Sequence, residues 1–211
     1  MGLHLPAGFR TAVVTASAGL LAVAGVLASA GPASAGSTLT VKYKVTGSTT
    51  LKAPNATLPL GPGKLTSTVD LTTGALTATL SLPNATGSFK QFGLIPVTAT
   101  AKLINDGPTT GSVDPSTGAV TSTSMITMRI VDLKVAGLDL PVGSACQTST
   151  PVSVTVNSQP GFNIVKGGNL AGTYTIPQFA NCGLETLLIN LTLPGPGNTI
   201  TLTLGKAKVV S

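Results

Sequence analysis

Histidine is almost absent from this chain of 211 residues, since the only one is His4, and tryptophan is absent altogether. Catalytic sites of the Ser–His–Asp or Cys–His kind need a base that titrates near neutral pH, and histidine is the side chain that supplies it without a special environment. Zinc, copper and non-haem iron sites rely on histidine or on several cysteines. We therefore expect a protein that is not an enzyme and that has no metal and no cofactor.

Carboxylates are also scarce, since the chain has six acidic residues and only one of them, Glu185, is a glutamate. A glycosidase needs two carboxyl groups on either side of the scissile bond. Asp132 and Asp139 are the best such pair, but a turn at Ala136 and Gly137 is expected between them, and they have opposite parity along a strand. We interpret both as solvated surface charges, and a carboxylate-only glycosidase is the one enzymatic alternative that the composition leaves open.

Charge of either sign is sparse, because charged residues make up 9% of the chain, although the balance is basic with a net charge of +6. The lysines are scattered along the sequence, whereas a nucleic-acid footprint requires them to be clustered. We therefore expect no nucleic-acid partner. A dispersed positive charge is compatible with cell-wall polymers, another surface protein or an apolar ligand as partners.

The N-terminus has the pattern of a secretory signal peptide. Arg10 is followed by an uncharged run rich in Ala, Val and Leu over residues 11–28, and small residues suitable for cleavage precede Gly36. We predict a signal peptide over residues 1–35, cleaved after Ala35 or, alternatively, after Ala30, and no transmembrane segment once it is removed. The protein is then secreted and is extracellular or associated with the cell wall.

Only two cysteines are present, Cys146 and Cys182. In an oxidising compartment they are expected to form a disulfide bond. The bond closes the loop of residues 147–181, which on the chain-entropy model stabilises the fold by roughly 3 to 4 kcal/mol.

Threonine, serine and glycine take the place of the charged residues that normally cover helices, and this composition favours strands. Apolar and polar residues alternate with a period of two, as half-buried strands require. Six segments show the pattern: residues 39–45, 65–71, 76–82, 97–103, 152–156 and 200–204. The phase of this alternation shifts at Ile130 and Val131, where we expect a β-bulge or a change of sheet.

These patterns predict a single all-β domain over residues 36–211, with at most one short helix near residues 183–190. We expect an antiparallel β-sandwich of immunoglobulin-like or jelly-roll style, and an antiparallel β-barrel is the alternative. Residues 69–77 and 113–121 repeat the same Asp-to-Gly turn pattern without gaps, so two similar hairpins are expected there.

Two apolar segments around Gly and Pro exceed what strand alternation requires, and they are expected to lie in loops or at strand ends. They either cap the core or form an apolar contact surface or pocket. The candidate contact residues are Phe89, Phe92, Leu94, Ile95, Leu138 and Leu140.

The Ala-rich N-terminus, residues 88–100, and residues 181–184 followed by 194–199 together resemble a family of secreted all-β proteins of actinobacteria that has no established function. The resemblance implies export from a bacterium and transfers no catalytic or binding residue. From the sequence we expect a secreted, non-enzymatic structural or interaction protein at or outside the bacterial cell surface. The alternative is an extracellular carrier of an apolar, lipid-like ligand.

Overall fold

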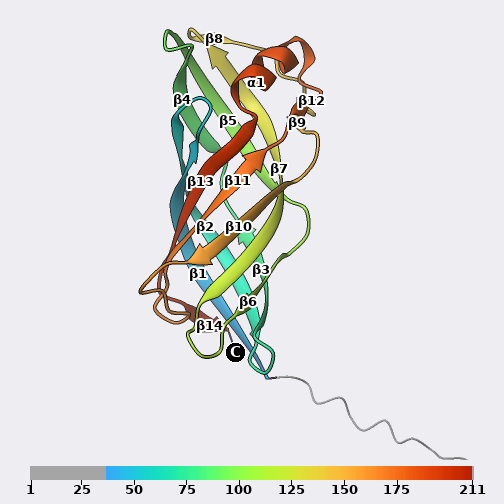
Figure 1. Ribbon diagram of the computed structural model, residues 1–211. Helices are drawn as coiled ribbons and strands as arrows, with labels where there is room; N and C mark the ends of the chain where they lie inside the picture. The colour runs from blue at the N-terminus through green and yellow to red at the C-terminus, as the bar shows by residue number, and fades with distance from the viewer. Residues whose placement is uncertain (1–36, 211) are drawn as a thin grey trace, which may run out of the picture. The chain divides into compact units, whose positions relative to one another are not determined.

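The computed structural model describes residues 37–210 (Figure 1). The predicted signal peptide therefore lies outside the described residues. The segments in which apolar and polar residues alternate form β-strands. The elements are β1 (Thr38–Leu51), β2 (Ala56–Asp70), β3 (Ala75–Ser81), β4 (Ala85–Gln91), β5 (Ile95–Asn105), β6 (Thr109–Val113), β7 (Val120–Val135), β8 (Leu138–Asp139), β9 (Gln147–Thr148), β10 (Val152–Ser158), β11 (Gly168–Ile176), β12 (Phe179–Ala180), a 3₁₀ turn η1 (Gly183–Glu185), α1 (Thr186–Thr192), β13 (Gly195–Leu204) and β14 (Lys208–Val210).

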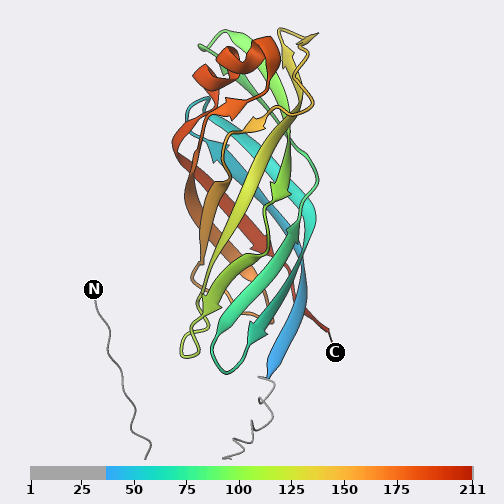
Figure 2. The same cartoon turned by 90° about the vertical axis from the view of Figure 1, so that its right-hand side faces the viewer.

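Eight antiparallel strands form a closed barrel in the order β1, β2, β3, β6, β7, β10, β11 and β13. The pairing of β13 with β1 and that of β10 with β7 complete the circuit, and Figure 2 shows the wall from a second side. The prediction of a single all-β fold is confirmed, and its form is the barrel that was the alternative to a sandwich. Closure removes most free strand edges.

Strand alternation fills the barrel with apolar side chains. Along β1, Val41, Tyr43 and Val45 are buried, while Lys42 and Lys44 between them are exposed. Successive side chains of a strand point to opposite faces, so one residue type enters the lumen and the other meets solvent. The same pattern along the other long strands makes the lumen the hydrophobic core.

The predicted β-bulge is present. Thr100 pairs with Asp132 and Ala101 pairs with Ile130, which leaves Val131 of β7 without a partner on β5. The extra residue reverses the inward face, so Ile130 and Leu133 are both buried although their parity differs.

The two similar hairpins are also confirmed, and they are built alike. Asp70 Oδ1 accepts bonds from the N–H groups of Thr72 and Thr73 at 2.8 and 2.9 Å. Asp114 Oδ1 accepts bonds from the N–H groups of Ser116 and Thr117 at 2.8 and 2.9 Å. Each turn then has a glycine with positive φ, Gly74 at 74° and Gly118 at 71°. These turns lie at the lower end of the barrel in Figure 1.

Hydrogen bonds also set the acidity of the two turn aspartates. The Ser116 hydroxyl, followed by the backbone N–H groups of Thr117 and Ser116, lowers the pKa of Asp114 to about 2. The N–H groups of Thr73 and Thr72 lower the pKa of Asp70 in the same way. Both side chains therefore act as ionised turn acceptors.

At the opposite end the helix covers the mouth of the barrel; we call this the α1 end. The turns between β4 and β5 and between β7 and β8 lie there as well (Figure 1). Ile189, Thr192 and Leu193 are buried against the barrel, and the helix of residues 186–192 corresponds to the one predicted near residues 183–190. The predicted disulfide is present, with Cys146 and Cys182 joined at an S–S distance of 1.98 Å, and it ties β9 to the start of η1.

Candidate functional site

Exposed apolar side chains gather at the α1 end. Thirteen large apolar residues are exposed within residues 37–210, and seven of them belong to this end. We call these seven the apolar end: Phe92, Leu94, Ile95, Leu138, Leu184, Leu187 and Leu191. Such grouping marks a contact surface, because isolated exposed apolar residues are ordinary but clustered ones are not.

Backbone and side-chain contacts join the segments that carry these residues. Gln91 at the end of β4 accepts a 2.8 Å hydrogen bond from the buried Thr192 hydroxyl of α1. Both residues also line a groove of about 570 Å³, together with Phe92, Leu191 and residues 53–55 of the β1–β2 turn. The N–H of Ala136 donates to Pro96 O at 2.8 Å, which holds the β7–β8 turn beside the β4–β5 hairpin. The apolar end is therefore one neighbourhood built from three segments.

Of the six predicted contact residues, Phe92, Leu94, Ile95 and Leu138 are exposed at the α1 end. The other two are partly buried. Leu140 packs against the core, and Phe89 lines a cavity inside the barrel.

Three residues of the apolar end were not predicted, and all belong to η1 and α1. Leu184, Leu187 and Leu191 are spaced i, i+3 and i+7, so they share one helical face. These three leucines are 97%, 70% and 69% exposed, in that order, while Ile189 on the other side of the helix is buried. The helical spacing was readable in the sequence. It gave no indication that this stripe, instead of the Ile189 side, would face outward.

Charges around the apolar end balance. Lys52, Lys90 and Lys134 stand against three acidic residues, Asp132, Asp139 and Glu185. Lys134 Nζ lies 2.6 Å from Asp139 Oδ1, and the Asp139 carboxylate, as hydrogen-bond acceptor and then as a charge, raises the pKa of Lys134.

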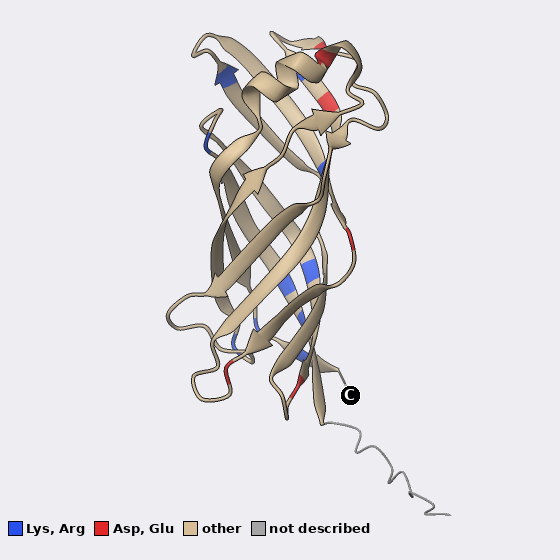
Figure 3. Cartoon of the chain, turned by 45° about the vertical axis from the view of Figure 1, so that its right-hand side comes forward, with Lys and Arg blue, Asp and Glu red and all other residues tan. Residues whose placement is uncertain are grey.

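Away from the apolar end, lysines that are scattered along the sequence come together: Lys44 pairs with Lys64 and Lys42 pairs with Lys208 in neighbouring ladders. All four are exposed, and they form a small basic patch on the outer face of β1, β2 and β14, where Figure 3 shows several blue segments on the lower half of the barrel.

The structure places the two candidate carboxylates near one lysine. Asp132 and Lys134 are two residues apart on β7 and so lie on the same side of the strand. Lys134 in turn pairs with Asp139 of β8 in the antiparallel ladder. The arrangement is an ion pair with a second carboxylate nearby, on the outside of the barrel.

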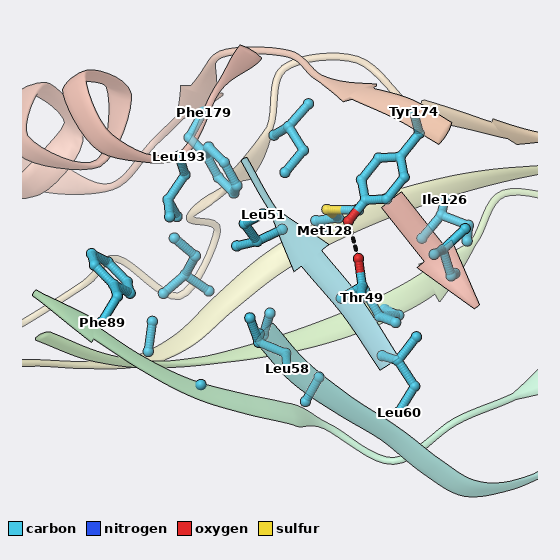
Figure 4. Close-up of a pocket in the computed structure, with 18 residues that line it drawn as sticks. Thr49, Leu51, Leu58, Leu60, Phe89, Ile126, Met128, Tyr174, Phe179 and Leu193 are labelled. Atoms are coloured by element: carbon cyan, nitrogen blue, oxygen red, sulfur yellow. Dashed lines mark hydrogen bonds between the residues drawn. The ribbon is translucent and has the colours of Figure 1, made fainter. Parts of the chain in front are cut away.

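Inside the barrel, the half nearer α1 contains an apolar cavity of about 70 Å³, which we call the upper cavity (Figure 4). Thr49 and Tyr174 supply the hydroxyl groups in its lining, and these bond to each other at 2.6 Å. Thr49 also donates to Thr199 O at 2.8 Å. Since a hydroxyl has one proton, Tyr174 is the donor to Thr49. Both hydroxyl protons in this lining are therefore used within the protein, and neither hydroxyl is free to donate a hydrogen bond to a ligand.

A second cavity of about 60 Å³, the lower cavity, lies in the other half of the lumen. Ser67 lines it, and its buried hydroxyl has no hydrogen-bond partner within residues 37–210. Val45 lines neither cavity and is fully buried between Tyr43 of the lower cavity and Thr49 of the upper one. Packed side chains at this level divide the lumen into two compartments.

Burial changes the acidity of both tyrosines of the chain. It raises the pKa of Tyr43 to about 12, and the phenol donates a 2.6 Å hydrogen bond to Ile164 O. Burial also raises the pKa of Tyr174, against a smaller opposing effect of its bond to Thr49. Both phenols are therefore protonated at neutral pH, and both side chains are buried in the core.

Across residues 37–210, no three His, Cys, Asp or Glu side chains lie together in a way that would hold a metal ion. The same stretch contains no helix with the length and apolarity needed to cross a membrane. Comparison with known proteins gave no matching family model, no similar curated protein and no similar solved structure.

Proposed function

We propose that this protein is a secreted, non-enzymatic interaction protein that works at or outside the bacterial cell surface, and that the apolar end is its contact surface. The observation that carries the proposal is the grouping of seven of the thirteen exposed large apolar side chains of residues 37–210 at one end of the barrel, while the other six lie elsewhere on its surface. Burial of each of these large side chains against a partner would contribute about 2 kcal/mol to the binding free energy.

Export is supported by the disulfide between Cys146 and Cys182, because such bonds persist in oxidising compartments. The N-terminal pattern of residues 1–35 points the same way. The mass of protein recovered from the culture medium tests this part, and we expect a chain that starts at Gly36 or, for the earlier cleavage, at Gly31.

The partner that we favour is the surface of a lipid layer. The apolar side chains project from two turns and a helix, and a fluid layer adapts to such separate projections. The charges around them balance, so apolar burial supplies the binding energy. A protein partner would need a matching surface with a hollow for each projecting side chain.

Flotation with phosphatidylcholine vesicles tests this surface. We expect the mature protein to float with the vesicles, and Leu184→Asp combined with Leu187→Asp to abolish flotation without loss of stability, because both leucines are exposed. Leu71→Asp is the matched control, since Leu71 is exposed at the opposite end. Equal flotation of all three proteins would contradict the assignment of the apolar end, and no flotation of the unaltered protein would contradict a lipid surface.

A second candidate function is the carriage of an apolar ligand, and the upper cavity is the observation that favours it. Its lining is apolar except for two hydroxyl groups that are already bonded to each other. Native mass spectrometry of protein from its own host tests this candidate. A native mass above the denatured mass by one discrete small molecule supports a carrier, and equal masses oppose it.

A further inference from the structure

Strands β4 and β5 lie outside the closed circuit of eight strands: β5 pairs with β7, and β4 pairs with β5. The ladder that they extend is interrupted between β4 and β2. Residues 56–60 of β2 pair with β1 on one side, but the pairing of β2 with β3 begins only at Lys64. Strand β4 pairs with β5 alone. No backbone hydrogen bond joins β2 to β4 anywhere in residues 37–210. We call this line of contact the seam; in Figure 1, β4 lies beside the hairpin that joins β1 and β2.

Side-chain packing closes the seam. Leu58 of β2 lies directly over Gly87 of β4, so close that a Cβ atom on Gly87 would stand 2.4 Å from Leu58 Cγ. Both residues are buried. Separating the two strands here breaks van der Waals contacts and no ladder bond, whereas separating any other pair of wall strands breaks several hydrogen bonds.

Directly behind the seam lies the upper cavity, and both Leu58 and Gly87 belong to its lining. Most of the residues that β4 and β5 turn toward the cavity are small, namely Ala85, Gly87, Ala99 and Ala101, and the two large ones are Phe89 and Leu103. At about 70 Å³ the cavity has roughly half the volume of an engineered apolar cavity that holds benzene, about 150 Å³. It therefore has room for the end of a hydrocarbon chain and not for a whole lipid.

We propose that the seam is the opening through which a single aliphatic chain inserts its terminal carbons into the upper cavity, with the rest of the chain lying between β2 and β4. The proposal rests on the carrier candidate above and names its site, its route and its ligand class. A polar headgroup stays outside, because the hydroxyl groups of Thr49 and Tyr174 are already bonded and a buried charge would have no partner.

The position of the seam connects it with the apolar end. Strand β4 ends at Gln91, and the next residue is the exposed Phe92. A chain that leaves a lipid layer touched by the apolar end would meet the seam without passing through water. In the backbone ladder β4 pairs only with β5, whereas β5 is also paired with β7. Apart from the bond between Gln91 and Thr192 of α1, β4 can therefore separate from β2 without loss of a hydrogen bond described above.

The experiment uses the mature protein with sodium dodecanoate below its micelle concentration as probe, and follows the methyl NMR signals of Ala85, Ala99 and Met128. A short bismaleimide cross-link between Thr57→Cys and Ser88→Cys locks the seam from outside. The matched control carries the same cross-link between Thr86→Cys and Thr100→Cys, positions that are already paired in the β4–β5 ladder with hydroxyl groups 2.9 Å apart. The control leaves the seam free.

We expect the locked seam to slow dodecanoate association about tenfold or more, as for binding that requires a conformational change, and the control to bind like the unaltered protein. Equal association rates for the two cross-linked proteins would overturn the seam as the route while leaving the carrier candidate standing. No shift of the cavity methyl signals in the uncross-linked protein would overturn the carrier candidate and this proposal together. Ile126→Phe, which fills the cavity from β7, a strand separated from β4 by β5, provides a second variant, and unchanged affinity in it would overturn the cavity as the site.

Discussion

Tyr174 and Thr49 join their hydroxyl groups across the lumen, and the direction of that bond is fixed by a third partner. Thr49 gives its proton to Thr199 O, so Tyr174 donates to Thr49. The bond connects β11 to β1, two strands separated in the wall by β13. It is the polar point in an otherwise apolar compartment.

This direction predicts unequal costs for removing the two partners. Tyr174→Phe leaves Thr49 bonded to Thr199 and should lower the free energy of unfolding by about 1 kcal/mol. Thr49→Val leaves the buried Tyr174 hydroxyl without an acceptor and should cost more, about 2 to 3 kcal/mol. Urea denaturation of the two variants measures both values, and equal costs would contradict the assigned direction.

The two similar turns predict a matched pair of glycine substitutions. Gly118→Ala meets open space and should cost about 1 kcal/mol from its positive φ alone. Gly74→Ala has the same φ penalty but would place Cβ 2.4 Å from Val113 O, so it should destabilise the protein clearly more. Thermal unfolding of both variants checks the order, and the reverse order would contradict the packing of Gly74 against β6.

Tyr43 predicts a loss of stability at alkaline pH. Its pKa is raised from 10 to about 12 in the folded protein, so the unfolded chain releases the phenolic proton first. The stabilisation is complete below pH 10 and is lost as the pH rises toward 12, by up to about 3 kcal/mol. Urea denaturation across this range measures the loss, and tyrosinate absorbance reports the ionisation.

Tyr43→Phe is the control for this pH dependence, because it leaves Tyr174 as the only tyrosine. The variant should lose less stability than the unaltered protein between pH 10 and 12. Ionisation of Tyr43 near pH 10 in the folded protein would refute the effect of burial.

Much of the fold was predictable, because alternation reports burial directly. The six alternating segments lie in β1, β2, β3, β5, β10 and β13, and the phase shift marked the bulge at Val131. Strand β4 was missed, since Ala85, Gly87 and Gln91 face inward there and give no apolar rhythm. Closure could not be read either, because it depends on β1 pairing with β13, for example Val45 with Leu204, and these two strands lie at opposite ends of the sequence.

The candidate site was predictable in part for a similar reason. Phe92, Leu94 and Leu138 stand out as apolar residues in turns, where strand alternation does not require them. Leu184, Leu187 and Leu191 were not found, because a helix with apolar residues on two faces does not reveal which face packs. The seam is a property of pairing, and no residue type signals it.

The disulfide predicts a local as well as a global effect. Replacing Cys146 and Cys182 by Ala should lower the free energy of unfolding by about 3 kcal/mol. Because the bond ties β9 to η1, amide hydrogen exchange should accelerate most in β9 and β12 and least in the β2–β3 hairpin. Uniform acceleration across the barrel would show that the bond acts only on the unfolded chain.

The position of β13 has a consequence for the order in which the protein can assemble. This last long strand inserts between β1 and β11, so the first strand of the barrel has only one wall neighbour until residues 195–204 have been synthesised. Because synthesis starts at the N-terminus, the barrel cannot close before β13 has been made, and its apolar lumen stays open until then. Shortening the chain before β13 should therefore abolish folding as a whole, whereas a fold with local strand pairing would lose only its final element.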